Sequence, residues 1–258
     1  YGLAHSILEK NDIYNESPFI HEKFLYLIKN EDDYEYGFGF VHEAMWGGST
    51  YMNGKFPSSF NDFLKVIISA DGEKMEGQIH ENALGNHLGI WDFYYRKINK
   101  SNVLKFYYQH FFEDTSGLRF QNRFDGLWGF EYNDLSSKFN FLVEYINTSN
   151  QDRDPPYVNE NYYNHSEYTL GWSYKGYVIG NPFLDNINNN PSKVIHAAIS
   201  NNDFNNYKFK ILLSKRIDTN DTLKYSLSIG KVFKNFTTSI LFNGSKSKNI
   251  GLRIFYDI

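Results

Sequence analysis

Asn206-Tyr-Lys-Phe-Lys-Ile-Leu-Leu-Ser-Lys-Arg-Ile217 alternates between apolar and polar side chains along most of its length. Successive side chains of a strand point to opposite sides, so this segment has two different faces. The apolar face consists of Tyr207, Phe209, Ile211 and Leu213, and the polar face of Lys208, Lys210, Ser214 and Arg216. Lysine and arginine are costly in lipid and stable in water. The segment therefore predicts a wall strand of a transmembrane β-barrel, with one face in lipid and the other in a wet lumen.

The same alternation recurs along the chain. It is strongest in Glu167 to Ile179, where Tyr168, Leu170, Trp172, Tyr174 and Val178 oppose polar residues. Further strands are predicted at 17–29, 33–43, 86–99, 102–114, 127–134, 138–148, 192–202 and, in the last third, around 223–229, 236–242 and 250–256. These give an all-β, antiparallel barrel of about a dozen strands. Short polar turns are expected on the periplasmic side, and long loops at 44–85, 114–126, 149–166 and 181–191 on the outer side.

The composition agrees with a barrel wall. The chain of 258 residues contains 21 Tyr and 23 Phe, yet its mean hydropathy is -0.54. Outward aromatic girdles explain the many Tyr and Phe residues, and inward polar positions explain the low mean hydropathy, because apolar and polar positions cancel in an average. A large soluble β-sandwich is the alternative fold with the same alternation, but sandwiches bury their apolar face and rarely carry so many Tyr and Phe at strand ends.

Several other classes of protein receive no support from the sequence. No segment approaches the roughly 18 to 20 consecutive apolar residues of a membrane-spanning helix. The chain has no cysteine, which excludes disulfides and zinc–thiolate sites and is compatible with export. A net charge of -4 gives no indication of a nucleic-acid partner. The N-terminus carries neither Met nor a signal sequence, so we expect a mature chain or the later part of a longer one.

One segment of the first long loop departs from the alternation. Phe60, Phe63, Leu64 and Ile67 recur at the spacing of one helix face, and Pro57 and Ser58 precede them in positions that open helices. The pattern predicts a short amphipathic helix over 58–68. We expect its apolar face to pack against neighbouring loops.

A set of motifs follows in order along the long loops and adjoining strands. They are His42-Glu-Ala-Met-Trp-Gly-Gly48, Pro57-Ser-Ser-Phe-Asn-Asp-Phe-Leu-Lys65, Glu81-Asn-Ala-Leu-Gly-Asn-His-Leu-Gly89, Tyr107-Tyr-Gln-His-Phe-Phe-Glu-Asp114, Asp125-Gly-Leu-Trp-Gly129, and Asn161-Tyr-Tyr-Asn-His165 followed by Ile179-Gly-Asn-Pro182. In this order, from about Ser17 to Pro182, the chain resembles the Wzi family of capsule-assembly outer-membrane proteins, in its Bacteroidota form.

This resemblance implies a monomeric barrel of the bacterial outer membrane with an occluded lumen. The barrel would act as a lectin-like anchor for capsular or exopolysaccharide, with membrane lipid as its other partner, no cofactor and no catalysis. Family members are longer and begin with a helical bundle and further strands. We therefore expect residues 1–258 to be a single barrel domain from the C-terminal portion, with edge strands that need partners.

Sugar binding requires aromatic rings for C–H surfaces and planar polar groups for hydroxyls or acids. The predicted outer loops contain both kinds of side chain. The candidate ligand-binding residues are Trp46, Glu113, Arg119, Arg123, Asp125, Trp128, Tyr162 and Tyr163. The alternative for each tryptophan is a packing anchor that helps to plug the lumen.

The histidines suggest metal binding or catalysis as alternatives to sugar binding. His42, His80, His87, His110 and His165 lack the spacing of a zincin helix, so we expect structural or hydrogen-bonding roles and no metal. Asn164-His165-Ser166 superficially resembles the site of an outer-membrane phospholipase. Adjacent residues of a strand point to opposite faces, however, so an extended chain would keep His165 and Ser166 apart.

Two further functions remain open. One is a channel for small solutes, which needs an open lumen, whereas the long segment between Glu43 and Asn86 favours a plug. The other is a barrel subunit within a larger outer-membrane assembly.

Overall fold

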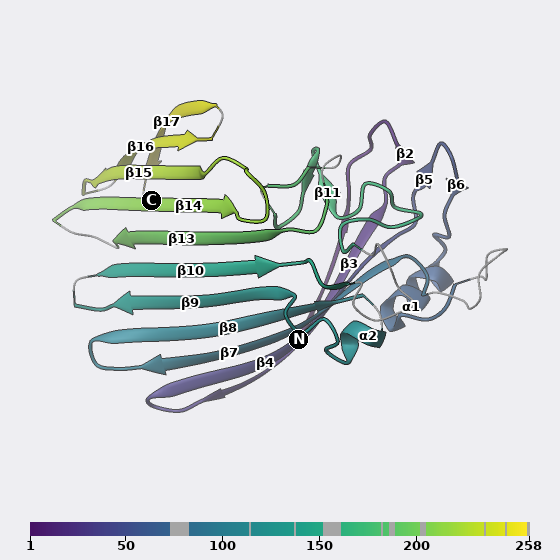
Figure 1. Cartoon of the computed structure of the whole chain (residues 1–258), viewed down its shortest axis with the longest axis horizontal. Helices are drawn as coiled ribbons and strands as arrows, with labels where there is room; N and C mark the ends of the chain where they lie inside the picture. The colour runs from purple at the N-terminus through teal and green to yellow at the C-terminus, as the bar shows by residue number, and fades with distance from the viewer. Residues whose placement is uncertain are drawn as a thin grey trace.

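The computed structural model describes residues 1–72, 83–113, 115–136, 138–151, 161–181, 183–185, 189–201, 205–234, 236–245 and 247–256. Twelve long strands form one antiparallel sheet in which chain neighbours are also sheet neighbours, with β1 at one edge and β17 at the other (Figure 1). The sheet consists of β1 (Gly2–Ile7), β3 (Phe19–Asn30), β4 (Tyr34–Trp46), β7 (Asn86–Ile98), β8 (Asn102–Phe112), β9 (Gly126–Asp134), β10 (Phe139–Asn147), β13 (Lys193–Asn201), β14 (Tyr207–Arg216), β15 (Lys224–Val232), β16 (Phe236–Gly244) and β17 (Lys248–Tyr256).

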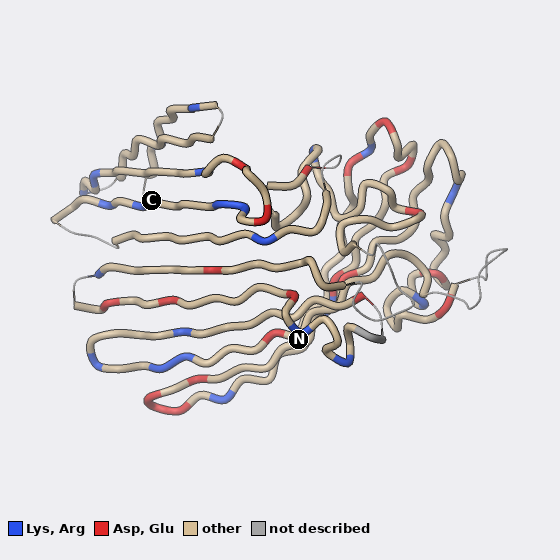
Figure 2. Tube along the Cα trace, in the orientation of Figure 1, with Lys and Arg blue, Asp and Glu red and all other residues tan. Residues whose placement is uncertain are grey.

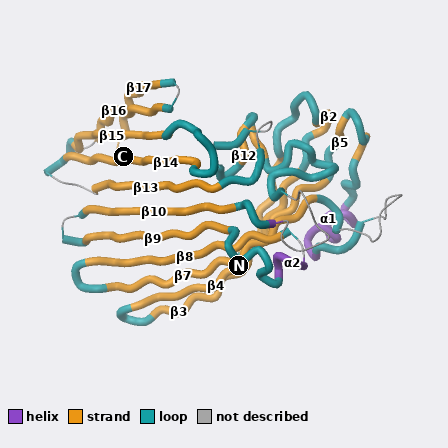
Figure 3. Tube along the Cα trace, viewed as in Figure 1, coloured by secondary structure: helices purple, strands orange, loops and turns teal. Residues whose placement is uncertain are grey.

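Short elements gather in the loops at one end of the sheet (Figure 3). They are β2 (Tyr14–Glu16), β5 (Ser49–Thr50) and β6 (Gly54–Lys55), which pair with one another, the hairpin of β11 (Ser173–Tyr174) and β12 (Tyr177–Val178), and the helices α1 (Phe60–Ile68) and α2 (Thr115–Leu118). At the opposite end, tight turns join β3 to β4 and β7 to β8, and many of the charged residues lie there (Figure 2). The predicted division into a short-turn end and a long-loop end is confirmed. Among the described residues, no helix has the length and apolar character needed to cross a membrane.

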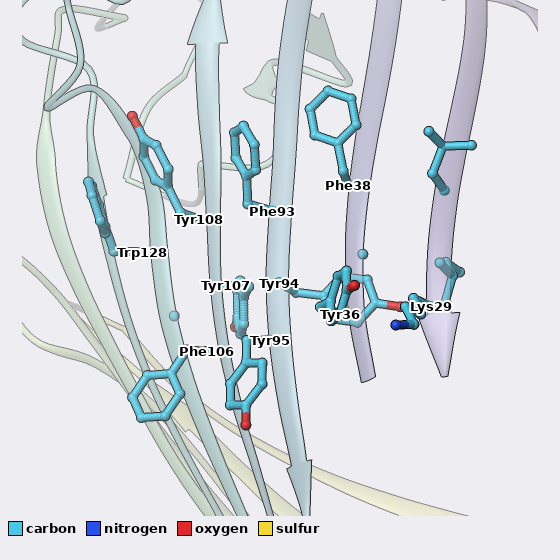
Figure 4. Close-up of a pocket in the computed structure, with 14 residues that line it drawn as sticks. Lys29, Tyr36, Phe38, Phe93, Tyr94, Tyr95, Phe106, Tyr107, Tyr108 and Trp128 are labelled. Atoms are coloured by element: carbon cyan, nitrogen blue, oxygen red, sulfur yellow. The ribbon is translucent and has the colours of Figure 1, made fainter. Parts of the chain in front are cut away.

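The two faces of the sheet differ in chemistry. On the face that we call outer, Leu27, Phe38, Phe93, Tyr108 and Trp128 lie opposite one another across five strands, and Figure 4 shows the last four as one row of rings. On the inner face, the Tyr26 hydroxyl donates to Asp92 over 2.9 Å, and Lys105 pairs with Glu131 at 3.7 Å. The expected alternation of apolar and polar faces is therefore confirmed.

Glycines on the inner face accommodate rings from neighbouring strands. An added Cβ at Gly129 would lie 2.0 Å from the ring of Tyr107, and one at Gly37 would lie 2.1 Å from the ring of Tyr94. The Tyr107 hydroxyl, held over Gly129, donates to the carboxylate of Glu144. A side chain at either glycine would displace a ring that carries an inner-face contact.

The prediction of a wall strand at 167–179 is wrong. The chain turns at Gly171, Lys175 and Gly176, which have φ of 54°, 51° and 79°, and only the β11–β12 hairpin is extended. Tyr168, Leu170 and Trp172 alternate because they are buried against Leu8, Tyr14, Met45 and Phe56 on the inner side of the loop end. The strand that the sequence analysis missed is β1, which keeps the total at twelve.

The predicted helix is present as α1. Ser59 is its N-cap, and a capping box joins Ser59 and Asp62, because each side chain accepts from the other residue's backbone N–H. The predicted apolar face is only partly correct. Val66 is fully buried and Phe63 half-buried, whereas Phe60 and Leu64 are exposed.

Candidate functional site

Two side chains of β8 hold the loop between β8 and β9, residues 113–125. His110 is fully buried, with Nε2 2.9 Å from the carbonyl oxygen of Gly117. The Tyr108 hydroxyl donates to the carbonyl oxygen of Arg123 over 2.7 Å. Both contacts bind the loop backbone, so its path is set by the end of the strand and not by the loop alone.

Asp125 joins this loop to the one that follows β10. Its carboxylate is fully buried and accepts from the Asn150 backbone N–H at 2.9 Å and from Asn150 Nδ2 at 2.6 Å. The Tyr162 hydroxyl also donates to it over 2.9 Å. Burial raises the pKa of Asp125, although the hydrogen bonds from Asn150 and Tyr162 oppose that shift. One carboxylate thus holds three segments of the loop layer together.

A second polar cluster lies beside β13. The Tyr163 hydroxyl donates to Thr148 Oγ1 over 3.1 Å, and Asn181 Nδ2 donates to Ser192 Oγ over 2.9 Å. Asn181 Nδ2 also reaches the Tyr163 hydroxyl at 3.2 Å, so the four side chains form one network. The network connects the segment after β10 with the one that leads into β13.

Four of the candidate sugar-binding residues are buried, and three of them belong to this packed scaffold. Asp125 and Tyr162 are brought together, and Tyr163 lies in the second cluster, with all three side chains buried. Trp46 is buried on the outer side of the loop end, its ring centroid 5.0 Å from that of Phe19. None of these rings offers an open face to a sugar in this arrangement.

Trp128 lies elsewhere. It belongs to the outer face of β9, where its ring stacks on Tyr108 at 3.9 Å between centroids (Figure 4). Arg119 and Arg123 are exposed on the 113–125 loop. Glu113 is half-buried: one carboxylate oxygen accepts from Gln151 Nε2 and the other is buried. Of the eight candidates, Arg119 and Arg123 combine a loop position with an exposed side chain.

Asn150, Asn122 and Thr148 also hold the scaffold, and they were not predicted from the sequence. Asn122 Nδ2 donates to the Phe111 carbonyl oxygen over 2.9 Å and to the Tyr162 hydroxyl. The available signal was weak: short polar side chains next to predicted strand ends, where they can bind backbone groups.

The histidines have the hydrogen-bonding roles expected of them. His42 Nε2 lies 2.8 Å from His87 Nδ1 and 3.0 Å from Ser69 Oγ. His165 Nδ1 accepts from the backbone N–H of Glu167, within a segment that is not a strand. His80 lies outside the described residues. Within the described part of the chain, no group of three or more His, Cys, Asp or Glu is arranged to hold a metal ion.

Comparison with known proteins gives a family and a structural relative. The model of the family described as capsule assembly protein Wzi matches residues 2–197. Among solved structures, the chain is similar to Wzi, described as a carbohydrate-binding β-barrel of the outer membrane involved in group 1 capsule assembly in Escherichia coli. The identity is 13% and the TM-score 0.45, and the alignment covers 97% of this chain and 62% of that one.

This chain thus spans less than two thirds of the length of that structure. Comparison with curated protein sequences gives no match. The family match includes the segments that carry the motifs from His42 to Pro182 and covers most of the chain. The chain therefore belongs to the family of the capsule assembly protein Wzi.

Proposed function

We propose that this chain forms the wall and the loop layer of an outer-membrane β-barrel that retains capsular or exopolysaccharide at the cell surface. The observation that carries the proposal is membership of the Wzi family over residues 2–197. The two-faced sheet and the packed loop end are the physical features that support it. No catalytic step and no cofactor form part of the proposal.

The outer face supports a place in the membrane. On β4 it runs from Tyr34 through Phe38 and Phe40 to His42, a rise of about 26 Å at roughly 3.3 Å per residue, close to the roughly 25 Å apolar band of outer-membrane barrels. Lysines occupy both ends of this face and not its middle: Lys29, Lys97 and Lys231 at the turn end, and Lys193 and Lys215 at the loop end. Such side chains extend to the water on either side of a bilayer.

A groove of about 720 Å³ also opens on this face (Figure 4). It lies between the row that contains Phe38, Phe93 and Tyr108 and the next row, with Tyr36, Tyr95 and Phe106. Its lining is almost wholly apolar, which suits acyl chains. Membrane lipid is therefore the proposed partner of the outer face.

Polysaccharide contact is proposed for the 113–125 loop. Arg119 and Arg123 carry planar cationic groups that can donate in pairs to acidic sugars or to hydroxyls. The loop is held by His110, Tyr108 and Asp125, so these side chains start from an ordered backbone. An ordered backbone reduces the entropy that binding must overcome.

The occluded barrel is favoured over a channel by the loop end. Tyr14, Met45, Phe56, Tyr168 and Trp172 form an apolar cluster on the inner side there. Apolar packing in this position leaves less room for a water-filled path. Planar-bilayer recordings test this choice, because a channel would conduct ions and an occluded anchor would not.

Deletion in the native host tests the function. We expect cell-bound capsule to fall while secreted polysaccharide stays constant, because an anchor acts after export. Binding of purified protein to its capsule should weaken in Arg119→Ala and Arg123→Ala, with Lys231→Ala at the turn end as the matched control. Unchanged retention after deletion would contradict the anchoring role even if the barrel is confirmed.

A further inference from the structure

Helix α1 lies on the outer face of the sheet. The Phe63 ring is 5.7 Å from that of Trp46 and 5.6 Å from that of His21, between centroids, and Val66 is buried in the same cluster. On β4, Trp46 is an even number of residues from Phe38, and on β3 His21 is an even number of residues from Leu27. Side chains at such spacing share a face, so α1 packs on the side that carries the aromatic rows.

The other side of α1 carries an apolar stripe that is exposed in the described part of the chain. Phe60, Leu64 and Ile68 are 73%, 45% and 72% exposed. They are spaced four residues apart and therefore lie above one another on the helix. Asn61 and Lys65 flank the stripe with polar side chains. Scattered apolar residues on a surface are ordinary, whereas a stripe at helical spacing with a polar flank is typical of a helix at a lipid interface.

Contacts at both ends fix the helix relative to the wall. Ser69 Oγ, at the C-cap, lies 3.0 Å from His42 Nε2, and Lys23 Nζ donates to the carbonyl oxygen of Ile67. Phe63, nearer the N-terminus, lies beside Trp46 at the far end of β4. The C-terminus of α1 is thus level with His42, and its N-terminus is farther from the wall's centre.

The level of His42 is also the limit of the apolar outer face on the side of the loop end. Below His42, the outer face continues as Phe40, Trp91 and Phe112, whose rings are in contact at 4.8 Å and 5.9 Å between centroids. Ile68 therefore lies at the level where the aromatic rows of the outer face end. Phe60 is about 12 Å away along the helix, at roughly 1.5 Å per residue.

We propose that α1 is a lipid-contacting element, in which Phe60, Leu64 and Ile68 enter the outer leaflet beside the barrel wall. Ile68 lies at the edge of the hydrocarbon, and Phe60 lies in the headgroup layer, where Lys65 can meet phosphate. The proposal rests on the proposed outer-membrane location of the wall. Lipid is favoured over a protein partner because the stripe continues the apolar outer face.

Spin labelling can test the depth of each position, since the sequence of 258 residues contains no cysteine that would need removal. The full-length protein is reconstituted in liposomes of phosphatidylcholine and phosphatidylglycerol. Single variants Phe60→Cys, Leu64→Cys and Ile68→Cys carry a nitroxide, and power saturation measures its access to oxygen, which prefers lipid, and to a water-soluble nickel chelate. Phe93→Cys is the lipid reference, and Arg123→Cys is the water reference.

We expect the ratio of oxygen to nickel access to fall in the order Phe93, Ile68, Leu64, Phe60 and Arg123. Equal nickel access for the Ile68 and Arg123 labels would overturn the proposal. Low access of all three stripe labels to both reagents would also overturn it, because it would indicate a protein cover. A Phe93 label that is open to nickel would contradict the membrane location itself, so the two failures are distinguishable.

Discussion

Asp125→Ala is expected to loosen the loop layer and leave the wall intact. The substitution removes the acceptor of three hydrogen bonds, two from Asn150 and one from Tyr162, in a fully buried position. A buried donor without a partner costs about 1 to 3 kcal/mol. A water molecule that enters the space left by the carboxylate offsets part of this cost, because it can accept hydrogen bonds. We expect the free energy of local opening to fall by about 2 to 4 kcal/mol.

Hydrogen exchange followed by mass spectrometry measures this change. In the regime where exchange reports the open fraction, a loss of about 2 to 4 kcal/mol speeds exchange roughly 30-fold to 900-fold. The effect should appear in peptides that cover 113–125 and 147–151 and not in peptides from β14 to β16. Asp32→Ala, in an exposed short turn, is the matched control.

Asp125→Asn separates the acceptor from the charge. The amide keeps one acceptor oxygen for Asn150 and removes a buried carboxylate, so its effect should stay below about 1 kcal/mol. If Asp125→Ala exchanges like Asp32→Ala, the carboxylate does not hold the loops and our account of the layer is refuted. Wall peptides that loosen with the loops would refute the separation of layer and wall.

Further predictions concern single groups. Tyr162→Phe removes one donor to Asp125 and should speed exchange of the same loop peptides by less than Asp125→Ala; an equal or larger effect would contradict the three-bond account. The pKa of Asp125 is raised above its ordinary 3.8 in the folded protein, so protonation favours the folded loop. That stabilisation is complete below pH 3.8 and is lost as the pH rises through the folded pKa. Loop opening, corrected for intrinsic exchange, should therefore become rarer on acidification in the natural protein and not in Asp125→Asn. Gly129→Ala should lower wall stability by about 1 to 3 kcal/mol, because its Cβ would meet the ring of Tyr107. Gly251→Ala, with 4.0 Å to its nearest neighbour, is the control for thermal unfolding in detergent.

The wall was predictable because one physical rule governs it. Alternation in β14 and its neighbours follows from lipid on one side and water on the other, and each strand shows it without reference to the rest of the chain. The segment from Tyr168 to Trp172 shows the same alternation for another reason. Its apolar side chains are buried against Tyr14, Met45 and Phe56, which are far away in the sequence. Periodicity cannot distinguish these two causes.

The loop layer was harder to predict for a related reason. Tyr162 and Tyr163 have the composition of sugar-stacking residues, yet each hydroxyl meets a buried partner, Asp125 or Thr148. Exposure in a loop depends on how distant segments fold over one another, and this is not encoded in local spacing. The capped helix α1 was predictable since its start signals are local.

The meander and the loop cluster have consequences for the order of assembly. Each long strand of the sheet pairs with the next long strand of the chain, so the wall can grow strand by strand in chain order. The Tyr168 hydroxyl, in contrast, donates to the carbonyl oxygen of Gly47, 121 residues away. That contact requires every strand from β7 to β10 to be present first. The apolar cluster at the loop end therefore depends on contacts between distant segments, and we expect it to form late in assembly, after the strands from β7 to β10 have paired.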